Sequence, residues 1–155
     1  WQGEGFAESS YQRMAQRMHL SGKKAQAWYE KRYMPLMVRM IGKYQRVNDW
    51  VIPFVEECRN RGVKIVVLSD YTHAKEKLEA LGLDTQVYEW VGSASELGGL
   101  KPAAELMQTL TERMGVAAAS CLVIGDREDT DGEMARKAGA DFCLVFSERA
   151  QSATV

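Results

Sequence analysis

A short apolar run that ends at a glycine and opens into an acidic loop constrains this 155-residue chain more than any other feature. Residues 121–124 are apolar and of strand length, Gly125 breaks the run, and residues 126–131 carry four carboxylates before a helical pattern resumes. This order predicts a strand that delivers an acidic loop. In an open α/β sheet the carboxyl ends of the strands form the ligand crevice, so carboxylates in this position can bind a hard cation such as Mg2+.

Other interpretations of the acidic loop explain less of it. Asp129 or Asp131 is also suited to capping the next helix, but a cap does not explain Asp126, which directly follows the glycine at the strand end. An EF-hand fits poorly, because aligning Gly132 with its loop glycine puts Arg127 at the first ligand position, where an oxygen is required. The Asp-x-Asp-Gly form within the loop matches a phosphoaspartate loop, but it lies several residues beyond its strand.

Composition and charge are those of an ordinary globular protein. The chain is 46% hydrophobic and 26% charged, with a formal net charge of -1. This balance gives no reason to expect nucleic acid or a membrane surface as a partner. The length predicts one main domain with room for a small accessory element.

The compartment predicted by default is the cytoplasm. No apolar run approaches membrane-spanning length, and Glu4, Glu8, Arg13 and Arg17 occupy the region where a signal peptide has its apolar core. The chain opens on Trp1 rather than Met, so we expect a processed product or a piece of something longer. The cysteines are odd in number, widely spaced and set in apolar surroundings, which predicts buried thiols at 58, 121 and 143.

The first 45 residues are predicted to form an accessory helical unit. An amphipathic pattern covers residues 6–20, and a second one covers residues 23–44 behind Ser21, a plausible N-cap. Pro35 is expected to kink or divide the second helix. The aromatic and methionine residues of this unit are interpreted mainly as packing, and part of their face as a candidate pocket lining.

Helices and strands alternate through the rest of the chain. Asn48 is a candidate cap for the first of these helices, and Thr72 with Glu76 suggests a capping box. The predicted elements are helix 48–60, strand 63–68, helix 72–81, strand 86–91, helix 103–114, strand 121–124, a helix to about 138 and strand 142–146. This alternation predicts an α/β fold, with right-handed crossovers and a parallel sheet covered by helices on both faces.

A parallel sheet would bring three separated loops to one rim. Ser69 and Asp70 follow one strand, Lys101 lies in a loop before a helix, and the acidic loop follows another strand. A hydroxyl at a strand tip can donate to a phosphate oxygen, a lysine supplies positive charge, and carboxylates hold Mg2+. The joint occurrence of these groups, more than any one of them, indicates a phosphate site.

The same segments carry a family pattern. They are residues 68–70 (Leu-Ser-Asp), 99–102 (Gly-Leu-Lys-Pro) and 123–131 (Val-Ile-Gly-Asp-Arg-Glu-Asp-Thr-Asp). In order and spacing they resemble the second, third and fourth motifs of the haloacid dehalogenase-like hydrolases, over roughly residues 46–146, and the phosphoglycolate phosphatase-like branch in particular. The resemblance implies a Rossmann-like core at 46–155 and a partial helical cap at 1–45.

The resemblance also implies a role for each site residue. Ser69 would hydrogen-bond the transferring phosphoryl group, and Lys101 would neutralise the phosphate and the nucleophile. Asp126 would ligate Mg2+ directly. Asp131, with Asp129 as the alternative, would orient the metal's waters or Lys101. The family commonly has Asn where this chain has Asp70, which leaves Asp70 as a substrate-binding candidate of unassigned role.

One motif of that family is missing from the chain. The Asp-x-Asp-x-Thr segment, which supplies the aspartate nucleophile and the acid-base aspartate at the end of the central first strand, has no counterpart before residue 46. We therefore expect that segment upstream of Trp1, either retained as an N-terminal fragment of the same protein, lost or left out. The chain alone is predicted to be inactive.

The predicted function of the complete protein is a Mg2+-dependent phosphatase that acts on a small phosphorylated metabolite through an aspartyl-phosphate intermediate. A phosphomutase or another phosphotransferase would use the same core. A binding or scaffold module that kept the fold and lost the nucleophile is the non-enzymatic alternative. The substrate itself is not predicted.

Overall fold

The computed structural model describes residues 5–146, with side chains from residue 11 onward. The chain divides into two compact units, Trp1–Gly98 and Gly99–Val155. The boundary falls inside the predicted core, so the assignment of residues 1–45 to a cap stays a prediction.

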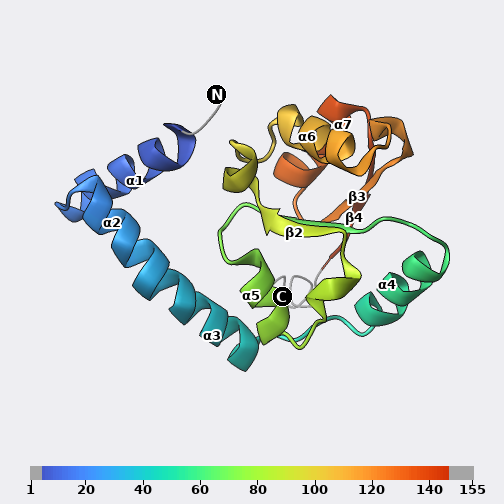
Figure 1. The fold of residues 1–155 in the computed structure, drawn as a ribbon, viewed down its shortest axis with the longest axis horizontal. Helices are drawn as coiled ribbons and strands as arrows, with labels where there is room; N and C mark the ends of the chain where they lie inside the picture. Colours follow the sequence, from blue (N-terminus) through green and yellow to red (C-terminus); the bar gives the residue numbers. More distant parts are fainter. Residues whose placement is uncertain (1–4, 147–155) are drawn as a thin grey trace, which may run out of the picture. The chain divides into compact units, whose positions relative to one another are not determined.

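The first unit begins with helices, as predicted. Ser21 Oγ accepts a hydrogen bond from the Lys24 backbone N–H at 3.4 Å, which confirms Ser21 as the N-cap. From there the chain stays helical to Tyr44 and is drawn as one nearly straight blue rod in Figure 1. The elements are α1 (Gly5–Met18), α2 (Gly22–Trp28), η1 (Tyr29–Tyr33) and α3 (Met34–Tyr44).

A π-helical turn carries this rod past Pro35. Pro35 has no backbone N–H to donate, and its ring excludes the preceding turn from regular α-geometry. Wider hydrogen bonds replace the regular ladder there, among them the bond from the Met34 N–H to the Tyr29 carbonyl. The predicted division at Pro35 therefore takes the form of the π-turn η1, without a break in the helix.

The rest of the first unit holds one parallel strand pair. Its elements are α4 (Val51–Asn60), β1 (Val66–Ser69), α5 (Ala74–Ala80), η2 (Thr85–Val87), β2 (Trp90–Ser93) and η3 (Ala94–Leu97). β1 and β2 are parallel, with Ser69 opposite Ser93 at their carboxyl ends. Helix α5 packs against both strands, and α3 packs on α5, where the backbone of Gly42 comes close to Ala80.

Two predicted boundaries in this unit are wrong because local polar contacts decide them. The strand predicted at 86–91 starts at Trp90, since Asp84 Oδ1 accepts from the Gln86 N–H at 2.9 Å and closes a 3-10 turn first. The predicted capping box of Thr72 is also absent: α5 starts after His73, whose φ is 60°, and Thr72 Oγ1 lies 3.0 Å from His73 Nδ1.

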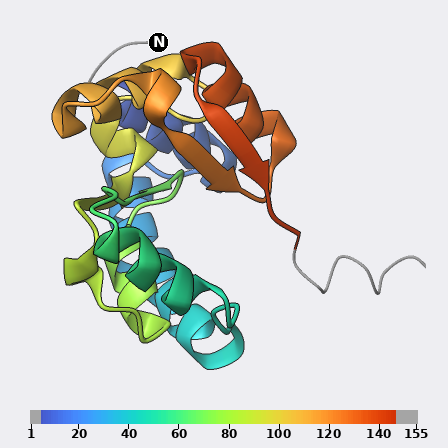
Figure 2. The same ribbon diagram turned by 90° about the vertical axis from the view of Figure 1, so that its right-hand side faces the viewer.

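The second unit is a smaller α/β assembly. Its elements are α6 (Ala104–Met114), η4 (Ala118–Ser120), β3 (Leu122–Gly125), η5 (Glu128–Gly132), α7 (Glu133–Ala138) and β4 (Asp141–Leu144). β3 and β4 are parallel and lie side by side in Figure 2. Leu106 and Leu110 of α6 and Met134 of α7 are buried. The predicted stops of α6 and α7 at Gly115 and Gly139 are confirmed, both with left-handed backbone.

One face of the β3–β4 pair is open in this unit. Leu122 is 56% exposed, and Ile124 and Cys143 on the same face are also exposed. The predicted burial of the cysteines is therefore wrong for Cys143, while Cys58 and Cys121 are half-buried; all three are free thiols.

The pairing of strands agrees with the predicted fold class. Both strand pairs are parallel, and the connections between consecutive strands contain helices, as in a Rossmann-like α/β fold. Within residues 5–146, β1 pairs with β2 alone and β3 with β4 alone. The predicted central strand that the chain lacks stays a prediction. None of the described helices has the length and apolar character needed to cross a bilayer.

Candidate active site

The acidic loop adopts a compact turn directly after β3. Gly125 ends the strand, and the π-helical turn η5 folds back so that the backbone N–H groups of Asp131 and Gly132 both reach the Arg127 carbonyl, at 2.8 and 3.2 Å. This turn carries the Asp131 side chain inward, and the residue as a whole is only 7% exposed. A carboxylate this deeply placed requires a partner, since an unpaired buried charge is costly.

Lys101 is that partner. Its Nζ donates to Asp131 Oδ1 at 2.7 Å, and the two side chains are 13% and 10% exposed. Lys101 reaches this position from the loop before α6, where a cis peptide bond joins it to Pro102. A lysine and an aspartate from separate loops thus form a nearly buried ion pair at the carboxyl end of β3.

Gly125 makes room for this pair. A Cβ at position 125 would lie 2.4 Å from Asp131 Oδ2 and 2.6 Å from its Cγ. Such distances are far inside van der Waals contact, so any larger residue would displace the carboxylate. The glycine that breaks the apolar run in the sequence therefore has a steric reason in the site.

Asp129 has a different environment from Asp131. Its two carboxylate oxygens accept from Arg127 Nε at 3.1 Å and from Arg127 Nη2 at 2.6 Å, on the exposed surface of the loop. The Arg127 hydrogen bond is the main cause that lowers the pKa of Asp129, and the same bond raises the pKa of Arg127. The sequence left both aspartates open as partners of Lys101, and the contact is made by Asp131.

Asp126 is exposed at the very end of β3. Within the described part of the chain it makes no hydrogen bond or ion pair, so its oxygens are available to a ligand. Mg2+ keeps several waters and is commonly held by one or two carboxylates together with substrate phosphate. The single available carboxylate of Asp126 fits such a site, and no cluster of three metal-ligating side chains occurs among the described residues.

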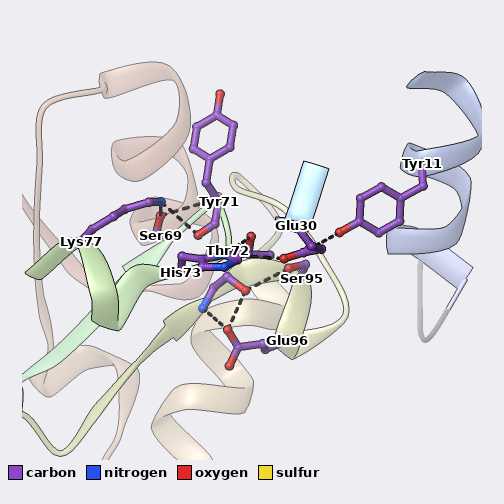
Figure 3. Close-up of polar contacts among 10 residues, drawn as sticks. Tyr11, Glu30, Ser69, Tyr71, Thr72, His73, Lys77, Ser95 and Glu96 are labelled. Atoms are coloured by element: carbon purple, nitrogen blue, oxygen red, sulfur yellow. Dashed lines mark hydrogen bonds and ion pairs between the residues drawn. The ribbon is translucent and has the colours of Figure 1, made fainter. Parts of the chain in front are cut away.

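Ser69 ends β1 in the first unit. Its Oγ lies 3.1 Å from the backbone N of Tyr71 and 3.4 Å from Nζ of Lys77, and Figure 3 shows the ammonium beside the hydroxyl. Asp70 follows in the same loop, half-buried. A serine hydroxyl at a strand tip beside an ammonium group is suited to binding an anion.

A polar chain that sequence analysis missed links the helical segment to the loop after β1. The Tyr11 hydroxyl donates to Glu30 Oε1 at 2.5 Å, and Glu30 Oε2 lies 3.6 Å from His73 Nδ1 (Figure 3). The pKa of the Tyr11 hydroxyl is raised, mainly because the group is partly buried and secondly because it donates to Glu30. The residues lie 19 and 43 positions apart along the chain, so no local spacing signals the contact.

The site residues predicted from the sequence are thus distributed over both units. Lys101 and Asp131 are brought together, and Asp126 ends the strand of the same unit. Ser69 and Asp70 belong to the first unit. A rim that all of them share stays a prediction.

Residues 6–139 match the family model of the haloacid dehalogenase-like hydrolases. The chain belongs to this family. The resemblance seen in the three motifs is therefore confirmed, and with it the general class of a hydrolase.

Solved structures support the same fold. A HAD phosphatase from Thermococcus onnurineus is similar with a TM-score of 0.68 at 20% identity, over 92% of this chain and 78% of that one. A beta-phosphoglucomutase from Clostridium difficile is similar with a TM-score of 0.72 at 14% identity, over 94% and 67% of the two chains. At these identities the likeness establishes the fold alone.

A curated relative covers part of the sequence. The chain is 32% identical over 77 residues, or 48% of its length, to "Protein SUPPRESSOR OF QUENCHING 1, chloroplastic" from Arabidopsis thaliana. The matched region spans 7% of the length of that protein.

Proposed function

We propose that the complete protein is a Mg2+-dependent phosphatase for a small phosphorylated metabolite. The observation that carries this proposal is the ion pair of Lys101 and Asp131 at 2.7 Å, directly beside a strand end that presents the available carboxylate of Asp126. A fixed ammonium group and a metal-binding carboxylate at the carboxyl end of a parallel strand are the elements that a dianionic phosphate requires.

Each residue has one proposed task. Ser69 donates its hydroxyl hydrogen to a phosphoryl oxygen, and Lys101 offsets the negative charge of the phosphate while Asp131 holds the ammonium in place. Asp126 holds the Mg2+ ion. Bound Mg2+ would supply Lewis-acid stabilisation of the phosphoryl oxygens. Asp70 keeps its place as a substrate-binding candidate beside Ser69.

The nucleophile is proposed to come from sequence outside this chain. An aspartate that forms the aspartyl-phosphate would lie on the strand absent from residues 5–146, which leaves β1 and β3 with one described strand neighbour each. An N-terminal fragment of the same protein is the proposed partner. The cytoplasmic location inferred from the sequence also stays a prediction.

Two other functions remain as named alternatives. A phosphomutase is favoured by the structural likeness to a beta-phosphoglucomutase, and it would pass the phosphoryl group to a second sugar hydroxyl where a phosphatase uses water. A non-catalytic module is favoured by the missing first motif. Product analysis separates the mutase, since it releases no inorganic phosphate.

The test compares the complete gene product with the 155-residue chain and with two variants of the complete protein. We expect 4-nitrophenyl phosphate hydrolysis by the complete protein with Mg2+, its loss with EDTA, and no hydrolysis by the chain alone. D126N should lose activity, whereas D129N, which removes a charge from the same loop, should retain it. Hydrolysis by the chain alone would contradict the missing nucleophile, and equal loss in both variants would contradict the assignment of Asp126.

A further inference from the structure

Lys77 lies beside Ser69 and has no task in the proposed function. It lies in α5, eight residues after Ser69, and its Nζ lies 3.4 Å from Ser69 Oγ and 3.4 Å from the Tyr71 carbonyl oxygen. Nζ also lies 5.5 Å from the centre of the Tyr71 ring. The ammonium is therefore held over the end of β1 by a hydroxyl, a carbonyl and a ring face (Figure 3).

The charge of Lys77 has no carboxylate partner among the described residues. The neighbouring Glu76 is exposed and interacts with Lys77 only through electrostatic attraction over a longer distance. No ion pair within 4.0 Å includes Lys77 among the described residues. Partial burial is the main cause that lowers the pKa of Lys77. A half-buried cation of this kind costs stability, and an anionic ligand would offset that cost.

The contacts of Ser69 indicate what this cation does. A serine oxygen has two lone pairs and one hydrogen. The Tyr71 N–H and the Lys77 ammonium can occupy both lone pairs, which leaves the hydroxyl hydrogen as the remaining group of Ser69. Ser69 is then fixed as a hydrogen-bond donor, as a phosphoryl oxygen requires, and not as an acceptor.

We propose that Lys77 is a positioning residue for phosphate binding, which orients the Ser69 hydroxyl as a donor and adds a second positive charge beside it. The inference rests on the proposed function for the identity of the anion as a phosphate ester. It adds to that function a cation from α5, at a position that none of the three family motifs includes.

A purely structural role of Lys77 can be distinguished from a role in phosphate binding. If Lys77 only stabilised the fold, its removal would lower the melting temperature and leave phosphate affinity unchanged. The uncompensated charge predicts the reverse, because removing a half-buried cation relieves its desolvation cost while anion binding suffers. Removal of Lys77 should therefore lower phosphate affinity without lowering the melting temperature, and both quantities can be measured on the same samples.

The experiment uses the complete gene product and its K77M, K75M, S69A and S69A/K77M variants. Lys75 lies on the same helix and is exposed, so K75M is the matched control for loss of one positive charge. Inorganic phosphate binding is measured by calorimetry in the presence of Mg2+, and the melting temperature is measured without phosphate. K77R tests whether another cation rescues binding.

We expect K77M to weaken phosphate binding roughly 10- to 100-fold, the range for loss of one charge-assisted hydrogen bond. The melting temperature should be unchanged or higher, K75M should bind as the parent does, and K77R should recover part of the affinity. Because Lys77 acts partly through Ser69, S69A/K77M should lose less than the product of the two single losses.

The results separate this inference from the proposed function. Phosphate binding that depends on Lys77 in a protein without phosphatase activity would retain the inference and overturn the function. Phosphatase activity with equal phosphate affinity in the parent and K77M would overturn the inference alone. A K77M protein that loses stability and affinity together, without rescue by K77R, would assign Lys77 to the fold.

Discussion

Nζ of Lys101 lies 2.7 Å from Oδ1 of Asp131, across 30 positions of sequence. The contact ties the loop before α6 to the π-turn after β3, and both side chains are nearly buried. A pair in this setting has two effects that can be separated. It holds an ammonium group at the strand end, and each partner also prevents the other from being an uncompensated buried charge.

The first prediction concerns that pair. D131N removes the negative charge that pairs with the Lys101 ammonium at 2.7 Å, so we expect a loss of about 3 kcal/mol in the free energy of unfolding. K101M/D131L removes both charges and should recover most of that stability, since two apolar side chains can replace a buried ion pair. Phosphatase activity of the complete protein should be lost in both variants. Denaturant unfolding together with the activity assay checks this, and a double variant as unstable as D131N would show that the pair does more than balance charge.

The second prediction concerns the close approach at Gly125. G125A places a methyl group within the contact distance of the Asp131 carboxylate, so the carboxylate must move. We expect overpacking to cost about 2 kcal/mol of stability and the displaced Lys101 to cost about 100-fold in kcat/KM. G139A is the control. Gly139 has left-handed backbone, which costs roughly 1 to 2 kcal/mol for any L-residue, but no atom lies within 4 Å of the position that a Cβ would take. The G139A variant should therefore lose stability and retain activity. Equal kcat/KM in G125A and the parent would refute the steric account.

Much of the fold was predictable because its signals are local. The cap at Ser21 and the glycine stops at 115 and 139 are each decided within one turn of chain, and the structure has all three. The start of the strand predicted at 86–91 is wrong because the Asp84 side chain accepts a hydrogen bond from the Gln86 N–H and closes a turn there. The pattern of apolar residues does not reveal this contact. The alternation of helices and strands, together with the family motifs, predicted the fold class, and the parallel pairing of both strand pairs agrees with it.

The candidate site was predictable in its residue types and not in its pairings. Asp129 and Asp131 are chemically alike and two positions apart, so only the π-turn decides that Asp131 is carried inward to Lys101. No sequence motif indicates a role for Lys77, because its contact with Ser69 depends on how α5 packs on β1. Long-range contacts of this kind depend on tertiary packing, which a single sequence does not reveal.

The third prediction concerns pH. Burial lowers the pKa of Lys77, so its ammonium is lost at a lower pH than that of an exposed lysine. The unfolded chain holds this proton more tightly than the folded one, and unfolding therefore takes up protons on the alkaline side. The free energy of unfolding contributed by Lys77 should rise with pH from its folded pKa up to the ordinary lysine range. Phosphate affinity should fall over the same pH range.

Arginine stays charged throughout that range, so K77R is the control for this titration. In K77R the decline of phosphate affinity on the alkaline side should begin at a higher pH than in the parent. Calorimetric titrations with phosphate at a series of pH values give the measurement. Parallel declines in the parent and K77R would assign the titration to another group.

The fourth prediction concerns the hydrogen bond between Tyr11 and Glu30. Tyr11 Oη donates to Glu30 Oε1 at 2.5 Å in a partly buried setting, and Glu30 also faces His73 in the loop that follows Ser69. Y11F removes the donor, so we expect a loss of roughly 1.5 to 3 kcal/mol in the free energy of unfolding, as for a hydrogen bond to a charged group. Y44F removes a hydroxyl from a tyrosine that is 52% exposed and should change stability little. Because Glu30 contacts His73 in the loop that follows Ser69, Y11F should also raise KM for a phosphate ester more than it lowers kcat. Equal stability of Y11F and Y44F by denaturant unfolding would show that the Tyr11 contact makes no net contribution.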